Sequence, residues 1–169
     1  MKILIIILTL FSGVPLFAQQ GNEFKNLKFD KVVMYDFEPI DKGGSIVEAN
    51  GLLTNTIKKQ VQLDNLIVNK LNSKLGNKKS FGGAAAACFE PHLGFVYYLN
   101  NKIVGHITIC LECNRLVSSI PIKVQKATKV GKGKDAYFLQ NNGMSKPFRI
   151  FLNDLLKQNN FSDQEEFLK

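Results

Sequence analysis

Four side chains that can bind a metal ion or form a covalent cross-link fall into two short-spaced pairs. Cys88 and His92 are separated by three residues. Cys110 and Cys113 are separated by two. Structural zinc sites are usually built from two such short-spaced pairs, which separate chain segments supply. Thiolates and imidazole are also the ligands that suit this borderline-soft cation. The spacing therefore predicts a structural zinc ion held by these four residues, with no coordination position left open for hydrolysis.

A disulfide is the alternative use of the same cysteines. Residues 100–101, Asn-Asn, can adopt the positive φ angles of a two-residue hairpin turn, which places Leu99 opposite Lys102. If this register persists along the two strands, Cys88 lies opposite Cys113, and the third cysteine is left over. On this interpretation the hairpin predicts a Cys88–Cys113 disulfide. The sequence leaves the choice between zinc and disulfide open.

A catalytic use of the thiols is the third interpretation. Cys110 and Cys113 can serve as a nucleophile or a redox pair, with His92 as the base. Catalytic C-x-x-C motifs usually begin a helix, whose dipole stabilises the thiolate, whereas this motif ends an expected strand. His106 lies in the middle of that strand, on the face opposite His92, and is expected to be a half-buried structural histidine. The sequence contains no nucleophile elbow, dinucleotide-binding fingerprint, metalloprotease helix or EF-hand loop.

These observations favour a non-enzymatic binding or accessory protein that is stapled by its cysteine cluster. A thiol-dependent enzyme or redox protein that uses Cys110 and Cys113 with His92 stays open as the alternative. No ligand, substrate or cofactor other than the zinc ion is indicated by the sequence.

Apolar periodicity predicts the elements that must position these residues. We expect an α+β fold, in which a mostly antiparallel β-sheet carries two amphipathic helices packed on one face. One helix covers 65–75, with Asp64 as its N-cap. The other follows Ser145 and has apolar residues at i, i+3, i+4, i+7 and i+8 from Phe148. The expected strands cover residues 29–37, 46–53, 54–63, 95–99, 103–110, 116–124 and 136–139, with a loop at 125–135.

The N-terminal residues are typical of a secretory signal peptide. Lys2 precedes the apolar stretch 3–11, and Ala18 is a small residue suited to signal-peptidase cleavage. The stretch is shorter than the roughly 20 residues of a membrane-spanning helix. We therefore expect a signal peptide at 1–18, a single domain at 19–169 with a fraying tail at 162–169, and a periplasmic or secreted protein without a transmembrane segment.

The charge balance is basic, with 22 Lys and Arg against 14 Asp and Glu, which gives a net charge of +8. An anionic surface is therefore one class of partner, and the lysines between Lys126 and Lys134 could bind an anionic polymer. Nucleic acid is not expected, because the sequence has only two arginines, Arg115 and Arg149, and no tryptophan. Base readout relies on arginine, and single-strand binding relies on aromatic stacking.

The cysteine cluster also resembles a motif of an uncharacterised bacterial family. Residues 88–94 (CFEPHLG) are followed by a hairpin and by residues 109–113 (ICLEC). This arrangement is similar to C-x-x-P-x-H-x-[LI], a hairpin and [IV]-C-[FLI]-x-C in secreted or lipid-anchored proteins with no assigned function. The similarity covers roughly residues 62–161, and Pro91 lies one residue nearer His92 than in the family. The resemblance implies a preserved Cys/His cluster in an exported domain, and it implies no activity.

Overall fold

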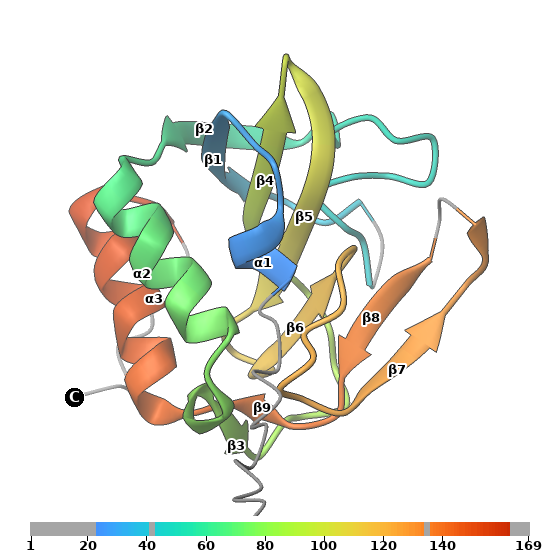
Figure 1. Ribbon diagram of the computed structural model, residues 1–169, viewed down its shortest axis with the longest axis vertical. Coiled ribbons are helices and arrows are strands. Elements are labelled where there is room, and N and C mark those ends of the chain that lie inside the picture. The colour runs from blue at the N-terminus through green and yellow to red at the C-terminus, as the bar shows by residue number, and fades with distance from the viewer. Residues whose placement is uncertain (1–22, 41–42, 134–135, 163–169) are drawn as a thin grey trace, which may run out of the picture.

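A seven-stranded antiparallel sheet forms the centre of the fold, in the order β2-β1-β4-β5-β6-β8-β7. The structure is a computed structural model that describes residues 23–40, 43–133 and 136–162 (Figure 1). The predicted signal peptide at 1–18 lies outside the described residues. The strands are β1 (Lys31–Phe37), β2 (Ile57–Gln62), β4 (Leu93–Leu99), β5 (Lys102–Cys110), β6 (Arg115–Ser118), β7 (Ala127–Val130) and β8 (Tyr137–Gln140).

Two longer helices accompany the sheet, α2 (Asn65–Leu75) and α3 (Lys146–Gln158). The Asp64 side chain caps α2 by accepting a hydrogen bond from the Ile67 backbone N–H at 2.8 Å, as the sequence predicted. None of the described helices is long and apolar enough to cross a bilayer. The remaining elements are α1 (Glu23–Asn26), the 3₁₀ turn η1 (Lys78–Ser80) and a two-stranded sheet of β3 (Phe81–Gly83) and β9 (Gly143–Met144).

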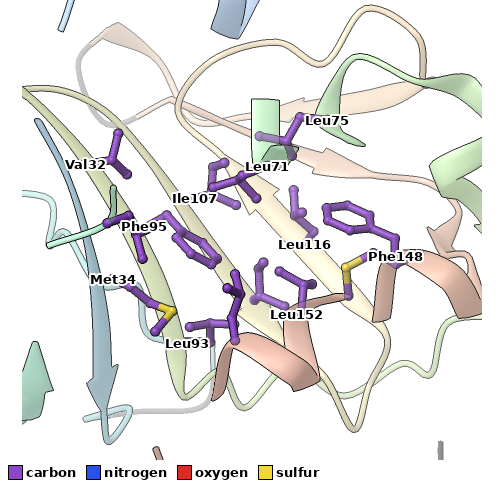
Figure 2. Close-up of a cluster of buried hydrophobic side chains, with 14 of the residues drawn as sticks. Val32, Met34, Leu71, Leu75, Leu93, Phe95, Ile107, Leu116, Phe148 and Leu152 are labelled. Carbon is purple, nitrogen blue, oxygen red and sulfur yellow. The ribbon is translucent and has the colours of Figure 1, made fainter. Parts of the chain in front are cut away.

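The α+β class and the antiparallel sheet are therefore confirmed. The main core joins alternate residues of the sheet to α2 and α3 (Figure 2). A second cluster contains the intervening residues of β1 and β4, with Ile46 from the loop between β1 and β2. Burial on both faces explains why β4 is an almost continuous apolar run. Figure 2 labels Val32, Met34, Leu71, Leu75, Leu93, Phe95, Ile107, Leu116, Phe148 and Leu152 of the main core.

The hairpin between β4 and β5 follows the predicted turn and then departs from the predicted register. Leu99 faces Lys102, as expected. Further along, Val104 has no partner on β4, so that Tyr97 faces Gly105. A bulge of this kind inserts one residue and displaces every later pair by one. The prediction of an unbroken register was therefore wrong, because a turn specifies the register only as far as the first bulge.

Three other predicted segments differ from the structure. The expected strand at 46–53 is a loop that folds back on itself, with one isolated bridge between Val47 and Leu53 and a turn at Gly51, whose φ is +81°. The expected strand at 116–124 leaves the sheet after Ser118. The expected loop at 125–135 contains β7, because this segment pairs with β8 to form the sheet edge. Strand pairing is a long-range property, which alternation within one segment does not show.

The chain beyond α3 is held against β1. Asp36 is buried, and its carboxylate accepts hydrogen bonds from the Ser162 backbone N–H at 2.9 Å and from the Ser162 hydroxyl at 3.0 Å. Phe161 is buried beside them in the main core. Ser162, the first residue of the tail expected to fray, is thus fixed, and residues 163–169 lie outside the described part of the chain.

Candidate functional site

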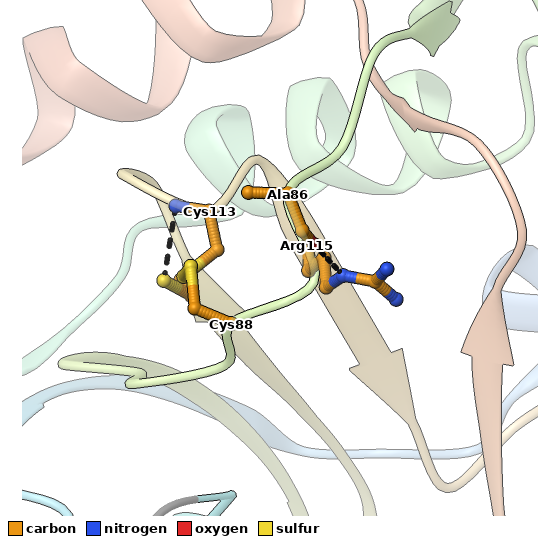
Figure 3. Close-up of a disulfide and its surroundings, with 5 residues drawn as sticks. Ala86, Cys88, Cys113 and Arg115 are labelled. Atoms are coloured by element: carbon orange, nitrogen blue, oxygen red, sulfur yellow. Dashed lines mark hydrogen bonds between the residues drawn. A yellow bond between two sulfur atoms is a disulfide. The ribbon is translucent and has the colours of Figure 1, made fainter.

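The structure joins Cys88 and Cys113 in a disulfide, with their Cα atoms 5.7 Å apart (Figure 3). Within the described residues, no group of three or more His, Cys, Asp or Glu side chains could hold a metal ion. The prediction of a zinc ion held by Cys88, His92, Cys110 and Cys113 was therefore wrong. The physical reason is that one sulfur of the Cys110–Cys113 pair is bonded to Cys88, while His92 has other partners. The disulfide alternative agrees with the structure.

Hydrogen bonds to neighbouring backbone, and not the predicted strand register, bring the two cysteines together. The segment before Cys88 runs beside the turn that connects β5 and β6. The Ala86 backbone N–H donates to the Cys113 carbonyl at 2.9 Å, and the Arg115 Nε–H donates to the Ala86 carbonyl (Figure 3). Asn114, whose φ of 51° closes the turn, donates from Nδ2 to the Ala84 carbonyl at 2.7 Å.

The remaining members of the predicted constellation lie in different surroundings. Cys110 is buried, and its Sγ accepts a hydrogen bond from the Cys113 backbone N–H at 3.2 Å. The His92 Nδ1 lies 3.2 Å from the Phe37 carbonyl oxygen and 3.3 Å from the Glu38 carboxylate. Hydrogen bonding to Lys58 in turn lowers the pKa of Glu38. The structure thus places His92 with the end of β1, where it has an acidic neighbour.

A pocket of about 840 Å³ is the feature that sequence reasoning missed. Its floor consists of side chains from β5, β6 and β8. Its walls come from described residues of the loop between β1 and β2, mainly 43–54, and from Ala87 and Phe89 on either side of Cys88. In Figure 1 α2 and α3 lie to the left of β5 and β6, and β8 and β7 continue the sheet to the right of β6. Along β5 and β6 the floor residues alternate with the core residues Ile107 and Leu116, which is the one signal that could have indicated them. The floor residues are His106, Arg115, Val117, Tyr137 and Leu139.

The wall of the pocket is fixed to β5 through Thr108. This residue is fully buried, and its hydroxyl lies 2.9 Å from the Ser45 hydroxyl and accepts a hydrogen bond from the Ile46 backbone N–H at 3.3 Å. Ile46 itself packs over Gly94, where an added Cβ would lie 2.7 Å from the isoleucine side chain. The missing side chain of Gly94 therefore lets the loop approach the sheet.

Replacing Thr108 by valine tests this attachment. Thr108→Val keeps the shape of the side chain but leaves the Ile46 N–H and the Ser45 hydroxyl without their partner, so we expect the free energy of unfolding to fall by about 1–3 kcal/mol. Urea unfolding measures the loss. Thr128→Val, at an exposed position on β7, is the matched control and should change stability by less than about 0.5 kcal/mol. Equal stabilities of the two variants would contradict the proposed anchor.

The charged groups of the pocket are few, and the polar side chains of Ser45, Asn50, Thr54 and Tyr137 accompany them. Burial lowers the pKa of His106 to about 4, so the imidazole is neutral at pH 7. Its Nδ1 is buried without a hydrogen-bond partner among the described residues. Arg115 forms no ion pair with any carboxylate in the described ranges. On the opposite wall, Glu48 accepts a hydrogen bond from the Asn50 side chain at 3.2 Å. The arrangement offers one fixed cation, one loop carboxylate and a neutral imidazole.

Apolar side chains are exposed around the mouth of the pocket. Ile40 is 56% exposed and Tyr137 is 38% exposed, and both line the pocket. Leu52, in the same loop as the pocket wall, is 65% exposed. Exposed apolar side chains that gather at a concave site are typical of a binding surface. We therefore regard the pocket as the candidate functional site.

The lysine-rich segment between Lys126 and Lys134 lies on the β7 edge of the sheet. Lys126, Lys129 and Lys132 are exposed, and Lys134 lies outside the described residues. Binding of an anionic polymer to this edge stays a prediction. Weaker binding to heparin at high salt, and its loss when the lysines are neutralised, would be the expected signs of such an interaction.

Comparison of the chain with protein-family models, with curated proteins and with solved structures found no match. The resemblance to an exported bacterial family therefore rests on the cysteine motif alone and stays a hypothesis. The function has to be argued from the chemistry of the pocket itself.

Proposed function

We propose that this protein is an exported, non-enzymatic binding protein whose ligand occupies the pocket over β5, β6 and β8. The single observation that carries this proposal is the pocket of about 840 Å³, with a largely apolar lining and a few fixed polar groups. Small-molecule sites commonly have this size and this composition. The disulfide supports export, because disulfides persist in oxidising compartments such as the periplasm and the extracellular space.

The distribution of side chains on the sheet supports different roles for its two faces, one that packs against the helices and one that is available to a ligand. We infer that α2 and α3 both cover one face, to which the core residue Leu116 belongs. Its neighbours Arg115 and Val117 line the pocket. Because successive strand residues point to opposite faces, the helices stabilise the fold on one side, and the other side is left for the ligand.

The burial of Cys110 and the disulfide at Cys113 favour a binding function over thiol catalysis. A catalytic cysteine needs contact with its substrate and a stabilised thiolate. Cys110 is 1% exposed, and Cys113 is engaged in the disulfide. The alternative of a thiol-dependent enzyme would require Cys110 to become exposed and the disulfide of Cys113 to be reduced. The pocket, in contrast, can accept a ligand in the conformation described.

Filling the pocket should abolish binding. We expect the wild-type protein to bind the fluorescent dye 1-anilinonaphthalene-8-sulfonate saturably, because the dye combines an apolar body with a sulfonate. Leu139→Trp places a larger side chain on the pocket floor and should weaken dye binding about tenfold or more. The affinity is measured by fluorescence titration.

Leu66→Trp is the matched control, since Leu66 is 64% exposed on α2 and does not line the pocket. It should bind the dye as the wild type does. Cooperative urea unfolding of both variants shows that the dye reports on the pocket and not on a loosened core. Equal dye affinities of Leu139→Trp and Leu66→Trp would refute the proposed function.

A further inference from the structure

We propose that the ligand of this pocket is an elongated amphipathic anion, whose carboxylate or similar head is held by Arg115 and whose apolar body lies over Val117 and Leu139. The inference rests on the proposed function, because it names the chemical class that the same pocket would accept. Three properties of the described residues lead to it: the fixation of Arg115, the distribution of charge, and the shape of the floor.

Arg115 is held in place before any ligand arrives. It begins β6 and pairs with Cys110 of β5. Its Nε–H donates to the Ala86 carbonyl, and the disulfide at Cys88 ties the Ala86 segment to the β5–β6 turn (Figure 3). The Nε–H bond orients the planar guanidinium, and its terminal N–H groups can donate to a second acceptor. A carboxylate is the acceptor that such a fork binds best.

The distribution of charge favours an anionic head at this end of the pocket. The imidazole of His106 is neutral at pH 7, because its pKa is about 4. Among the described residues that line the pocket, Arg115 is thus the one side chain with a positive charge at pH 7. The one carboxylate of that lining, Glu48, lies on the turn of the opposite wall and is hydrogen-bonded by Asn50. The net charge of +8 also attracts anions to the protein from a distance.

The shape of the floor favours an elongated ligand. Arg115 lies at one end of β6, and the Ser119 backbone N–H donates to the His106 carbonyl at the other end. These positions are four residues apart along the strand, which corresponds to about 13 Å. Val117 and Leu139 face each other between the two ends. A single small head group therefore cannot reach both Arg115 and His106, and the apolar middle requires an apolar body.

Three probes that share one chain and differ in the head group test this inference. Dodecanoate, 1-dodecanol and dodecylamine are titrated into the wild-type protein at pH 7, below their aggregation concentrations, by displacement of the dye. We expect dodecanoate to bind about tenfold or more tightly than the other two, because a charge-assisted pair with Arg115 is available to it alone. Arg115→Gln should remove this preference and leave the affinity for 1-dodecanol unchanged.

Lys129→Gln is the matched control, since it removes the same charge from an exposed position on β7 outside the pocket lining. It should keep the preference for dodecanoate. If Arg115→Gln does not fold, Arg115→Lys takes its place. The preference should then decrease, because lysine cannot make the two-pronged contact, and an unchanged preference would overturn the inference.

The outcomes separate the failure of this inference from failure of the proposed function. Equal affinities of the three probes for the wild type would overturn the inference that the ligand is an amphipathic anion. A preference for dodecanoate that survives in Arg115→Gln would overturn it as well. The pocket would remain a binding site if Leu139→Trp still weakened all three probes. Absence of binding by every probe and by the dye, or binding that Leu139→Trp does not weaken, would overturn both.

Discussion

Removal of the disulfide by the double substitution Cys88→Ala/Cys113→Ala is expected to lower the free energy of unfolding by about 3.5 kcal/mol. The two cysteines are 25 residues apart in the sequence. A cross-link over this span restricts the unfolded chain, and the restriction is lost when the bond is removed. Urea unfolding without reductant measures the change. A loss of this size is a large fraction of the stability of a domain of this length.

Reduction of the wild-type protein provides the control for this experiment. A phosphine reductant should lower the unfolding midpoint of the wild type towards that of the double variant, and it should leave the variant unchanged. The intact mass of the oxidised wild type should be two hydrogens below that of the reduced chain, and one of its three cysteines should react with a thiol reagent after unfolding. Three reactive thiols in protein isolated without reductant would contradict the cross-link.

The same experiment connects the disulfide to the pocket. Cys88 holds the segment whose Ala86 carbonyl accepts the hydrogen bond from Arg115. Reduction should therefore weaken the orientation of the guanidinium at the end of the pocket. We expect the preference for dodecanoate over 1-dodecanol to fall in the reduced protein, provided that the protein is still folded at the temperature of the titration.

The buried imidazole of His106 is expected to make the protein less stable in acid. Its pKa is about 4 in the folded protein and 6.5 when unperturbed, because burial disfavours the charged form. Above pH 6.5 the imidazole is neutral in both states and has no effect. As the pH falls from 6.5 to 4, the unfolded chain takes up a proton that the folded protein does not, so stability decreases. Below pH 4 both states are protonated, and the loss is complete.

The size of this effect follows from the difference in pKa. It corresponds to about 3 kcal/mol of unfolding free energy between pH 7 and pH 4. His106→Gln lacks the titrating group and should lose about that much less stability than the wild type over this range. Urea unfolding of both proteins at several pH values gives the comparison. Parallel pH profiles of the wild type and the variant would show that His106 titrates normally in the folded protein.

Elements with strong local signals could be predicted from the sequence. The helix at 65–75 has its N-cap at Asp64 and its apolar stripe within eleven residues, and the structure contains α2 with those bounds. The turn at 100–101 has two asparagines that tolerate positive φ, and the structure gives them φ values of 50° and 62°. In both cases the interactions that decide the conformation lie within a few residues of each other.

The cysteine chemistry was predicted only as a set of alternatives. Spacing alone allowed zinc, a disulfide or a reactive thiol, because each of these uses needs only that the residues can approach one another. The structure decides through contacts between distant segments: Ala86 lies beside Cys113, and His92 lies beside Phe37 and Glu38. A bulge at Val104 also displaces the register that had placed Cys88 opposite Cys113.

The sequence by itself determined the α+β class, the two longer helices, the central hairpin and the candidate cysteine pairs. Each of these follows from periodicity or turn chemistry that acts over short stretches of chain. Only the tertiary structure decided which sulfurs bond and where the pocket lies. The pocket lining comes from β5, β6, β8, the segment around Cys88 and the loop anchored by Thr108. These segments carry no shared local pattern, and their side chains meet only because the strands pair across long stretches of sequence.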